Sequence, residues 1–141
     1  MINTGAIEFS ASQPCETESS HPIRVVVIDD SEGFRVVICE LLRMLFDIEI
    51  VGIGSNGFEA LELTAQQAPD LVIMDVNMPV LDGIAAAGLI RHHFPTTTIL
   101  MMSGEDTPEM RSSCLRVGAD GFTPKRWLTS EFAQMQPGLC K

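Results

Sequence analysis

Residues 69–79 read PDLVIMDVNMP, and this stretch is the strongest indication of the fold class. Its centre, Leu71–Met74, is an unbroken apolar run, which is typical of a short strand covered on both faces. Pro69 ends the helix expected before the strand, and the polar Asp75 ends the strand itself. Because strands buried on both faces occur in parallel sheets flanked by helices, the stretch predicts an α/β protein.

The same alternation of strand and helix runs along most of the chain. The expected strands are Ile23–Ile28, Ile48–Ile53, Leu71–Met74, Thr98–Met102 and Gly121–Thr123. The expected helices begin at Ser31-Glu32, Asn56-Gly57, Gly83, Thr107-Pro108 and Ser130, the last running to Gln136. Short loops between the elements favour parallel crossovers. The predicted fold class is therefore a doubly wound, five-stranded parallel sheet in the order 2-1-3-4-5 with five helices.

The first two helices carry clear apolar patterns, and we expect their apolar faces to pack on the sheet. The residues that recur every three or four positions are Phe34, Val37, Ile38, Leu41, Leu42 and Leu45 in the first helix, and Phe58, Leu61 and Ala65 in the second. Cys39 and Cys114 fall within helices and lack the spacing of metal ligands. They are predicted to be buried thiols.

Length and charge narrow the function classes. A chain of 141 residues suits one domain, expected over residues 23–136 between a disordered leader (1–22) and a short tail (137–141). The net charge of −10 argues against nonspecific nucleic-acid binding, since few lysine and arginine side chains are present to replace the counterions around the phosphates. No apolar run approaches the roughly 20 residues of a membrane span. Without a secretory signal or a disulfide pattern, a cytoplasmic location is expected.

Polar residues follow four of the five predicted strands. Asp29 and Asp30 come after the first strand, Asp75 after the third, Ser103 after the fourth and Lys125 after the fifth. In open parallel sheets ligands bind beyond the carboxyl ends of the strands, and the first and third strands are neighbours in the predicted order. We therefore expect these side chains to share one site.

Three carboxylates at one site favour a bound cation. Two of them about 5 Å apart repel by roughly 3 kcal/mol at an effective dielectric near 20. Ligands that are all oxygens indicate Mg²⁺ rather than zinc, and the ion would neutralise an incoming phosphoryl group. Lys125 and Ser103 can contact phosphoryl oxygens, which leaves Asp75 as the carboxylate nucleophile of an acyl phosphate.

Two longer motifs resemble those of one family. The stretch at 69–79 followed by Asp82-Gly83, and the segment GADGF at 118–122 leading to Lys125, are similar to the motifs of two-component response-regulator receiver domains, which have the flavodoxin-like or CheY-like fold. The resemblance runs from about residue 23 to 136. It implies that the chain is a single-domain receiver that is phosphorylated on Asp75 by a histidine kinase, a phosphotransfer protein or acetyl phosphate.

The resemblance also implies roles for the other site residues. The implied Mg²⁺ ligands are Asp30, Asp75, the backbone carbonyl of Asn77 and, through water, Asp29. Ser103 would move toward the phosphoryl group, and Phe122 would change rotamer with it. The fourth helix, fifth strand and fifth helix would then present an altered surface to a downstream protein or to a second copy. Asn77 and Glu105 hold the family positions that tune phosphoryl lifetime, and these polar side chains predict a short-lived phosphoryl group.

Three departures from the family pattern stand out. The family usually has proline directly after the lysine, whereas here Pro124 precedes Lys125 and Arg126 follows it. Phe122 lacks the hydroxyl of the commoner tyrosine. The last helix is short, and we expect Phe132 and Met135 to anchor it, with Trp127 covering part of the gap.

Other readings compete with a stand-alone receiver. The chain can be the receiver piece of a longer DNA-binding transcriptional regulator. Phosphatases of the haloacid dehalogenase type use similar residues, but they need an aspartate where Asn77 stands. A flavodoxin-like electron carrier would need a phosphate-binding loop where Asp29-Asp30 stands. We therefore expect a protein that accepts a phosphoryl group and loses it again, and not an enzyme with a separate substrate.

Overall fold

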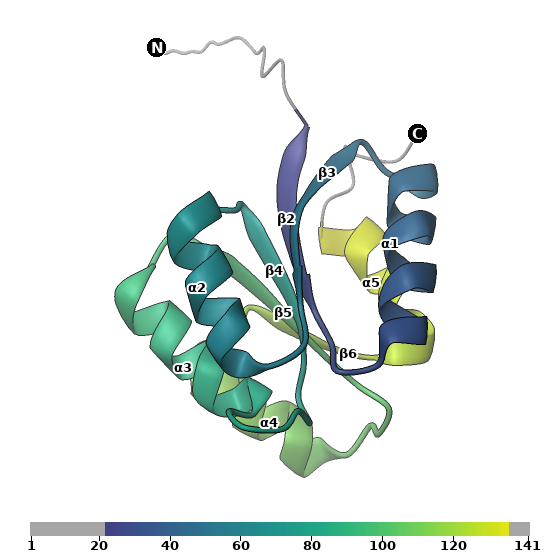
Figure 1. Cartoon of the computed structure of the whole chain (residues 1–141). Helices are drawn as coiled ribbons and strands as arrows, with labels where there is room; N and C mark the ends of the chain where they lie inside the picture. Colours follow the sequence, from purple (N-terminus) through teal and green to yellow (C-terminus); the bar gives the residue numbers. More distant parts are fainter. Residues whose placement is uncertain (1–21, 136–141) are drawn as a thin grey trace, which may run out of the picture.

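The computed structural model describes residues 22–135, in which strands and helices alternate as predicted (Figure 1). The strands are β2 (Ile23–Ile28), β3 (Ile48–Gly54), β4 (Leu71–Asp75), β5 (Thr98–Ser103) and β6 (Gly121–Pro124). The helices are α1 (Glu32–Leu45), α2 (Gly57–Gln67), α3 (Gly83–His93), α4 (Pro108–Arg116) and α5 (Leu128–Met135), with a 3-10 turn η1 (Lys125–Trp127) before α5. The predicted tail and all but the last residue of the predicted leader lie outside the described residues.

The strands form one parallel sheet in the order β3-β2-β4-β5-β6. This is the predicted order 2-1-3-4-5, so the predicted fold class is confirmed. Figure 1 shows α1 and α5 on one face of the sheet and α2, α3 and α4 on the other. Within residues 22–135, no helix is both long and apolar enough to cross a membrane.

Each of the first four helices begins at a side-chain cap. Ser31, Asn56, Asp82 and Thr107 each accept a hydrogen bond from the backbone N–H three residues later. Such caps satisfy amide groups that the first helical turn leaves without partners. Each cap lies between the carboxyl end of a strand and the next helix. The caps therefore set where the chain turns away from the carboxyl ends of the strands.

Two apolar layers hold the sheet between the helices. On one side, side chains of β2, β4 and β5 pack against Leu42, Phe46 and Phe132. On the other side they pack against Ala60, Ala86, Ile90 and Cys114. Both predicted buried thiols are confirmed, since Cys39 and Cys114 are almost fully buried. Burial raises the pKa of Cys114 to about 11, so this thiol is protonated at neutral pH.

The predicted apolar faces of α1 and α2 were partly wrong. In α1 the buried residues are Ile38, Cys39 and Leu42, whereas Val37, Leu41 and Leu45 are exposed. Because α1 is apolar on more than one side, its spacing fits two overlapping faces, and the sheet buries only one of them.

In α2 the buried residues are Gly57, Ala60 and Thr64, whereas Phe58 is 56% exposed and Ala65 is also exposed. A Cβ atom on Gly57 would lie 2.5 Å from the backbone oxygen of Leu81. The start of α2 therefore approaches the loop before α3 too closely for a large side chain, and small residues take the inner face.

The last helix begins at Leu128, two residues before the predicted Ser130, because the chain turns through η1 directly after β6. Phe132 is fully buried, and its ring centroid lies 4.5 Å from that of Phe46 at the end of α1. Met135 packs at the edge of the same core, so both expected anchors are confirmed. Trp127 is 56% exposed and does not cover the core as expected.

Candidate functional site

The sheet register places the carboxyl ends of four strands at one edge. Ile28 of β2 pairs with Met74 of β4, so Asp29 and Asp75 follow at the same level. Asp75 pairs with Met102 of β5, and Ser103 pairs with Pro124, the residue before Lys125. The residues that the sequence placed after different strands are therefore neighbours.

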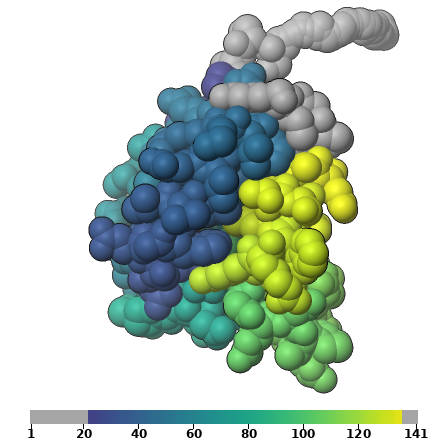
Figure 2. All heavy atoms as spheres, turned by 90° about the vertical axis from the view of Figure 1, so that its right-hand side faces the viewer, coloured from purple at the N-terminus to yellow at the C-terminus, as the bar shows by residue number. Residues whose placement is uncertain are grey.

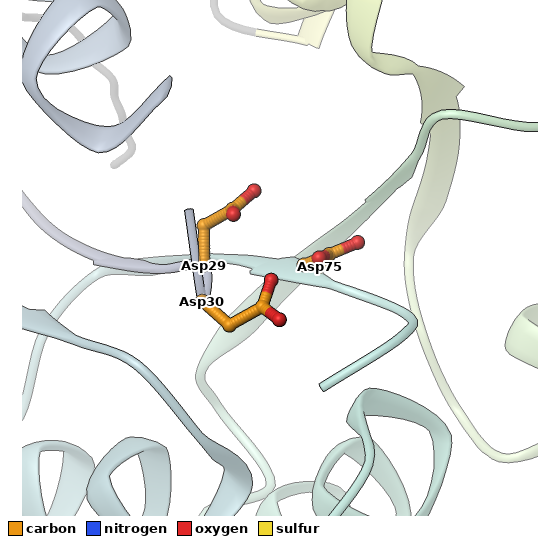
Figure 3. A group of neighbouring side chains, drawn as sticks. All are labelled: Asp29, Asp30 and Asp75. Atoms are coloured by element: carbon orange, nitrogen blue, oxygen red, sulfur yellow. The ribbon is translucent and has the colours of Figure 1, made fainter. Parts of the chain in front are cut away.

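Three carboxylates meet at this edge. Figure 3 shows Asp29 and Asp30 at the end of β2 with their carboxylates on the side where Asp75 lies. One oxygen from each of the three lies within 4.8 Å of the others. Asp29 and Asp75 are buried, whereas Asp30 is exposed. The group is therefore closed toward the sheet and open toward solvent on the Asp30 side.

The two carboxylate oxygens of Asp29 have different surroundings. Its Oδ1 accepts a hydrogen bond of 2.8 Å from the Ser31 N–H, which ties the strand end to the start of α1. Its Oδ2 is buried and forms an ion pair of 2.6 Å with Nζ of Lys125. This buried oxygen therefore already faces the positive charge of Lys125.

Lys125 reaches the carboxylates from the far side of the site. Its Nζ lies 2.6 Å from Asp29 Oδ2 and 3.5 Å from Asp75 Oδ2. Burial alone lowers the pKa of Lys125, but the two carboxylates outweigh it, and the pKa lies above that of an ordinary lysine. The ammonium is therefore charged, even though Arg126 stands where the family usually has proline.

Among the carboxylates that the structure describes, Asp75 has the most strongly perturbed pKa. Burial raises its pKa, the negative charges of Asp29 and Asp30 raise it further, and Lys125 and the Asn77 N–H lower it. The resulting pKa is about 6, against an ordinary value of 3.8. A buried carboxylate beside two others is costly to ionise, and added positive charge at the site would lower that cost.

The residues next to Asp75 and Ser103 lie at the mouth of the site. The Asn77 N–H donates to Asp75 Oδ1 at 3.4 Å, and its residue is exposed. Ser103 is fully buried, and its Oγ accepts from the Glu105 N–H at 3.1 Å. Glu105 is exposed. The serine hydroxyl therefore lies at the sheet edge, between the strand end and the loop that leads to α4.

Phe122 lies one strand away, under α4. It is buried, and the Arg111 guanidinium lies 5.0 Å from the centroid of its ring. Arg111 also donates to the Phe122 backbone oxygen at 3.2 Å and pairs with Asp106 at 3.4 Å. A single side chain of α4 thus connects β6 with the loop after β5.

Three residues near the site were not found from the sequence. The Phe34 ring lies under Lys125, Arg35 donates to the backbone oxygen of Asp29, and Arg111 covers Phe122. The sequence pattern predicts Phe34 only as a core position of the first helix. The two arginines carry no local pattern that distinguishes them from surface arginines, because their contacts depend on how α1 and α4 pack.

The carboxylates fit a hard divalent cation. All three candidate ligands supply carboxylate oxygen, which Mg²⁺ prefers, and these oxygens lie within 4.8 Å of one another. The raised pKa of Asp75 has the same origin as an attraction for a cation, namely negative charge crowded into a partly buried space.

Comparison with known proteins agrees with this geometry. The family model described as response regulator receiver domain matches residues 25–136. The signal receiver domain of the response regulator NarL from Mycobacterium tuberculosis superposes with a TM-score of 0.77 at 30% identity, covering 84% of this chain and 99% of that one. For the response regulator domain of Thermotoga maritima CheB, the TM-score is 0.74 at 32% identity, with coverages of 82% and 93%.

Curated relatives are longer proteins. Protein-glutamate methylesterase/protein-glutamine glutaminase 4 of Hahella chejuensis is 38% identical over 104 residues, which cover 73% of this chain but 27% of that protein. The transcriptional regulatory protein DegU of Brevibacillus brevis is 32% identical over 110 residues, covering 78% of this chain and 47% of that protein. The chain therefore spans between about a quarter and a half of the length of these relatives.

Proposed function

The chain belongs to the family of response-regulator receiver domains, and we propose that it accepts a phosphoryl group on Asp75. The observation that carries this proposal is the arrangement around Asp75. Its carboxylate lies at the end of a central strand, 3.5 Å from a charged lysine and within reach of two further carboxylates. The nucleophilic carboxylate, the lysine ammonium and the carboxylates that could bind a metal thus lie close together.

The transfer follows from this arrangement. A carboxylate oxygen of Asp75 attacks the phosphorus of the donor, the bond between phosphorus and the leaving group breaks, and the leaving group takes the bonding electrons. Lys125 then balances negative charge on the transferred phosphoryl oxygens. The buried hydroxyl of Ser103 can donate to another oxygen once its loop moves toward the site. Hydrolysis of the acyl phosphate by water returns Asp75 to its original state.

Magnesium is the cation that we propose for this site. Asp30 and Asp75 would bind it directly, together with the backbone carbonyl of Asn77, and Asp29 would contact it through water. When bound, the ion supplies positive charge that offsets the repulsion between the carboxylates and an incoming phosphoryl group. The described residues supply the remaining features: they hold the nucleophile in place and shield it from bulk solvent.

Lifetime and switching are further parts of the proposal. Asn77 and Glu105 flank the mouth of the site, are exposed and polar, and can orient a water molecule toward the phosphoryl group, which favours a short lifetime. Movement of Ser103 would pull the loop after β5, and Arg111 connects that loop with Phe122. We propose that this connection carries the signal to the face formed by α4, β6 and α5.

Two features of that face support the proposal that it binds a protein. A hollow of about 270 Å³ lies between α4 and α5, and its lining includes Arg111, Phe122, Trp127 and Glu131. The exposed Trp127 ring offers an apolar contact beside charged groups, a combination that is common at protein interfaces. We propose a downstream protein or a second copy as the occupant, and a histidine kinase or phosphotransfer protein as the phosphodonor.

We propose a receiver that accepts a phosphoryl group without turning over a separate substrate. We also propose that it acts in the cytoplasm. The methylesterase and transcriptional activities in the names of the relatives belong to proteins that extend well beyond the matched segment. A receiver acting alone and a receiver within a longer regulator use the same site chemistry. Asn77 stands where a haloacid dehalogenase phosphatase needs its acid, so that reading is the weaker one.

Acetyl phosphate with Mg²⁺ tests the central claim. Intact mass after brief incubation is expected to show one added phosphoryl group on the wild type and none on Asp75→Asn. The matched control is Asp47→Asn, because Asp47 is an exposed aspartate in the turn after α1. This control is expected to behave like the wild type. Phosphorylation of both Asp75→Asn and the wild type, or of neither, would contradict the proposal.

A further inference from the structure

We propose that Phe34 is a positioning residue for Lys125, and that its ring holds the lysine ammonium in line with Asp75. The proposal rests on the proposed function, in which Lys125 contacts the phosphoryl group. The contact behind it does not depend on that function: the ammonium of Lys125 lies 4.6 Å from the centroid of the Phe34 ring. At that distance, the negative face of an aromatic ring attracts a cation.

Phe34 is held in place before it meets the lysine. It lies in the first turn of α1, and its N–H donates to Oγ of Ser31, the residue that caps the helix. Its ring is half-buried against the apolar layer beneath α1. The ring therefore has a fixed position relative to Asp29, only five residues earlier in the chain.

Lys125 has few other supports. Its side chain is 22% exposed, and its described charged neighbours are the carboxylates of Asp29 and Asp75. The carboxylates attract the ammonium unequally, because Asp29 lies nearer than Asp75 by about 1 Å. The ring of Phe34 adds a third contact that attracts the ammonium without competing for its hydrogen bonds.

The sequence around Lys125 makes this contact more important. Pro124 precedes the lysine and Arg126 follows it, so the backbone after Lys125 lacks the proline that is usual in the family. Lys125 instead begins the 3-10 turn η1, which leads directly into α5. Figure 2 shows the yellow segment that contains η1 and α5 lying along the blue α1. The contact between the Phe34 ring and the Lys125 ammonium lies across the boundary between these two segments.

Lysine labelling gives a direct test, because the chain contains only two lysines, Lys125 and Lys141. In protein labelled with carbon-13 lysine and free of metal, the methylene protons beside the Lys125 ammonium are expected to be shifted upfield by the ring current of Phe34. Lys125→Arg assigns the signal. Phe34→Leu, which keeps an apolar side chain, is expected to abolish the upfield shift, and Phe34→Tyr is expected to keep it.

The same variants test the functional consequence. With acetyl phosphate and Mg²⁺, Phe34→Leu is expected to be phosphorylated about five times more slowly than the wild type, at an unchanged Mg²⁺ affinity measured by calorimetry. Phe34→Tyr is expected to restore the rate, because it restores the aromatic face. The control Phe58→Leu removes an exposed aromatic ring from α2 and is expected to have no effect.

The outcomes separate this inference from the proposed function. An unshifted Lys125 signal in the wild type, or equal slowing by Phe34→Leu and Phe34→Tyr, overturns the positioning role. A wild-type rate in Phe34→Leu also overturns it. If the Lys125 signal depends on the ring but the wild type accepts no phosphoryl group, the proposed function fails while the contact stands.

Discussion

Asp75→Asn is expected to stabilise the metal-free protein. The folded state holds the carboxylate of Asp75 with a pKa of about 6, whereas the ordinary value is 3.8. Between these values the folded state binds more protons than the unfolded state, so stability falls as the pH rises. This difference in pKa means that ionised Asp75 lowers the unfolding free energy by about 3 kcal/mol. The full loss of stability is reached above roughly pH 7. Asparagine has nearly the same shape and carries no charge.

Urea unfolding in the presence of EDTA, followed by circular dichroism, measures the effect. At pH 7.5 Asp75→Asn is expected to exceed the wild type in unfolding free energy by about 3 kcal/mol, and at pH 4.5 by only about 1 kcal/mol. The control Asp47→Asn changes an exposed aspartate and is expected to shift stability by less than about 0.5 kcal/mol.

Magnesium gives the second half of the test. An ion that binds only the folded wild type at a hundred times its Kd adds about 2.7 kcal/mol. Asp75→Asn lacks one ligand, so the difference between the two proteins is expected to shrink nearly to zero in saturating Mg²⁺. If Asp75→Asn gained no stability at pH 7.5, or gained the same amount at both pH values, the account of crowded carboxylates would be refuted.

Three more substitutions probe the fold around the site. Val80→Gly is expected to raise the unfolding free energy by about 1 kcal/mol in urea titrations. The reason is that Val80 is 79% exposed and has a positive φ of 71°, which strains a β-branched residue. A lower stability of Val80→Gly would show that the valine side chain makes a stabilising contact. Gly83→Ala is expected to lower the melting temperature and slow phosphorylation, because the added Cβ would lie 2.0 Å from the Asp75 backbone oxygen. A melting temperature and a phosphorylation rate equal to those of the wild type would mean that the start of α3 shifts freely. Phe132→Ala is expected to cost about 3 to 5 kcal/mol in the same titrations, because it empties a fully buried site beside Phe46, and a loss below about 1 kcal/mol would show that α5 contributes little.

Much of the fold could be predicted from local pattern. The buried run Leu71–Met74 and the caps Ser31, Asn56 and Thr107 mark where strands and helices begin and end, and such marks depend on near neighbours in the chain. Where a pattern had two solutions, the prediction was partly wrong. In α1 the residues Ile38 and Leu42 are buried against the sheet, whereas Val37, Leu41 and Leu45 are exposed.

The site divides in the same way. Which residues meet could be predicted from the sequence, because polar residues that end parallel strands share one edge of the sheet. Asp29, Asp75 and Lys125 all stand at such ends. How they meet depends on the packing of the folded chain. The pKa of Asp75 near 6 and the Phe34 ring beneath Lys125 depend on burial and on the packing of α1 against the segment after β6. Burial and packing join residues about 90 positions apart, and no local pattern encodes such contacts.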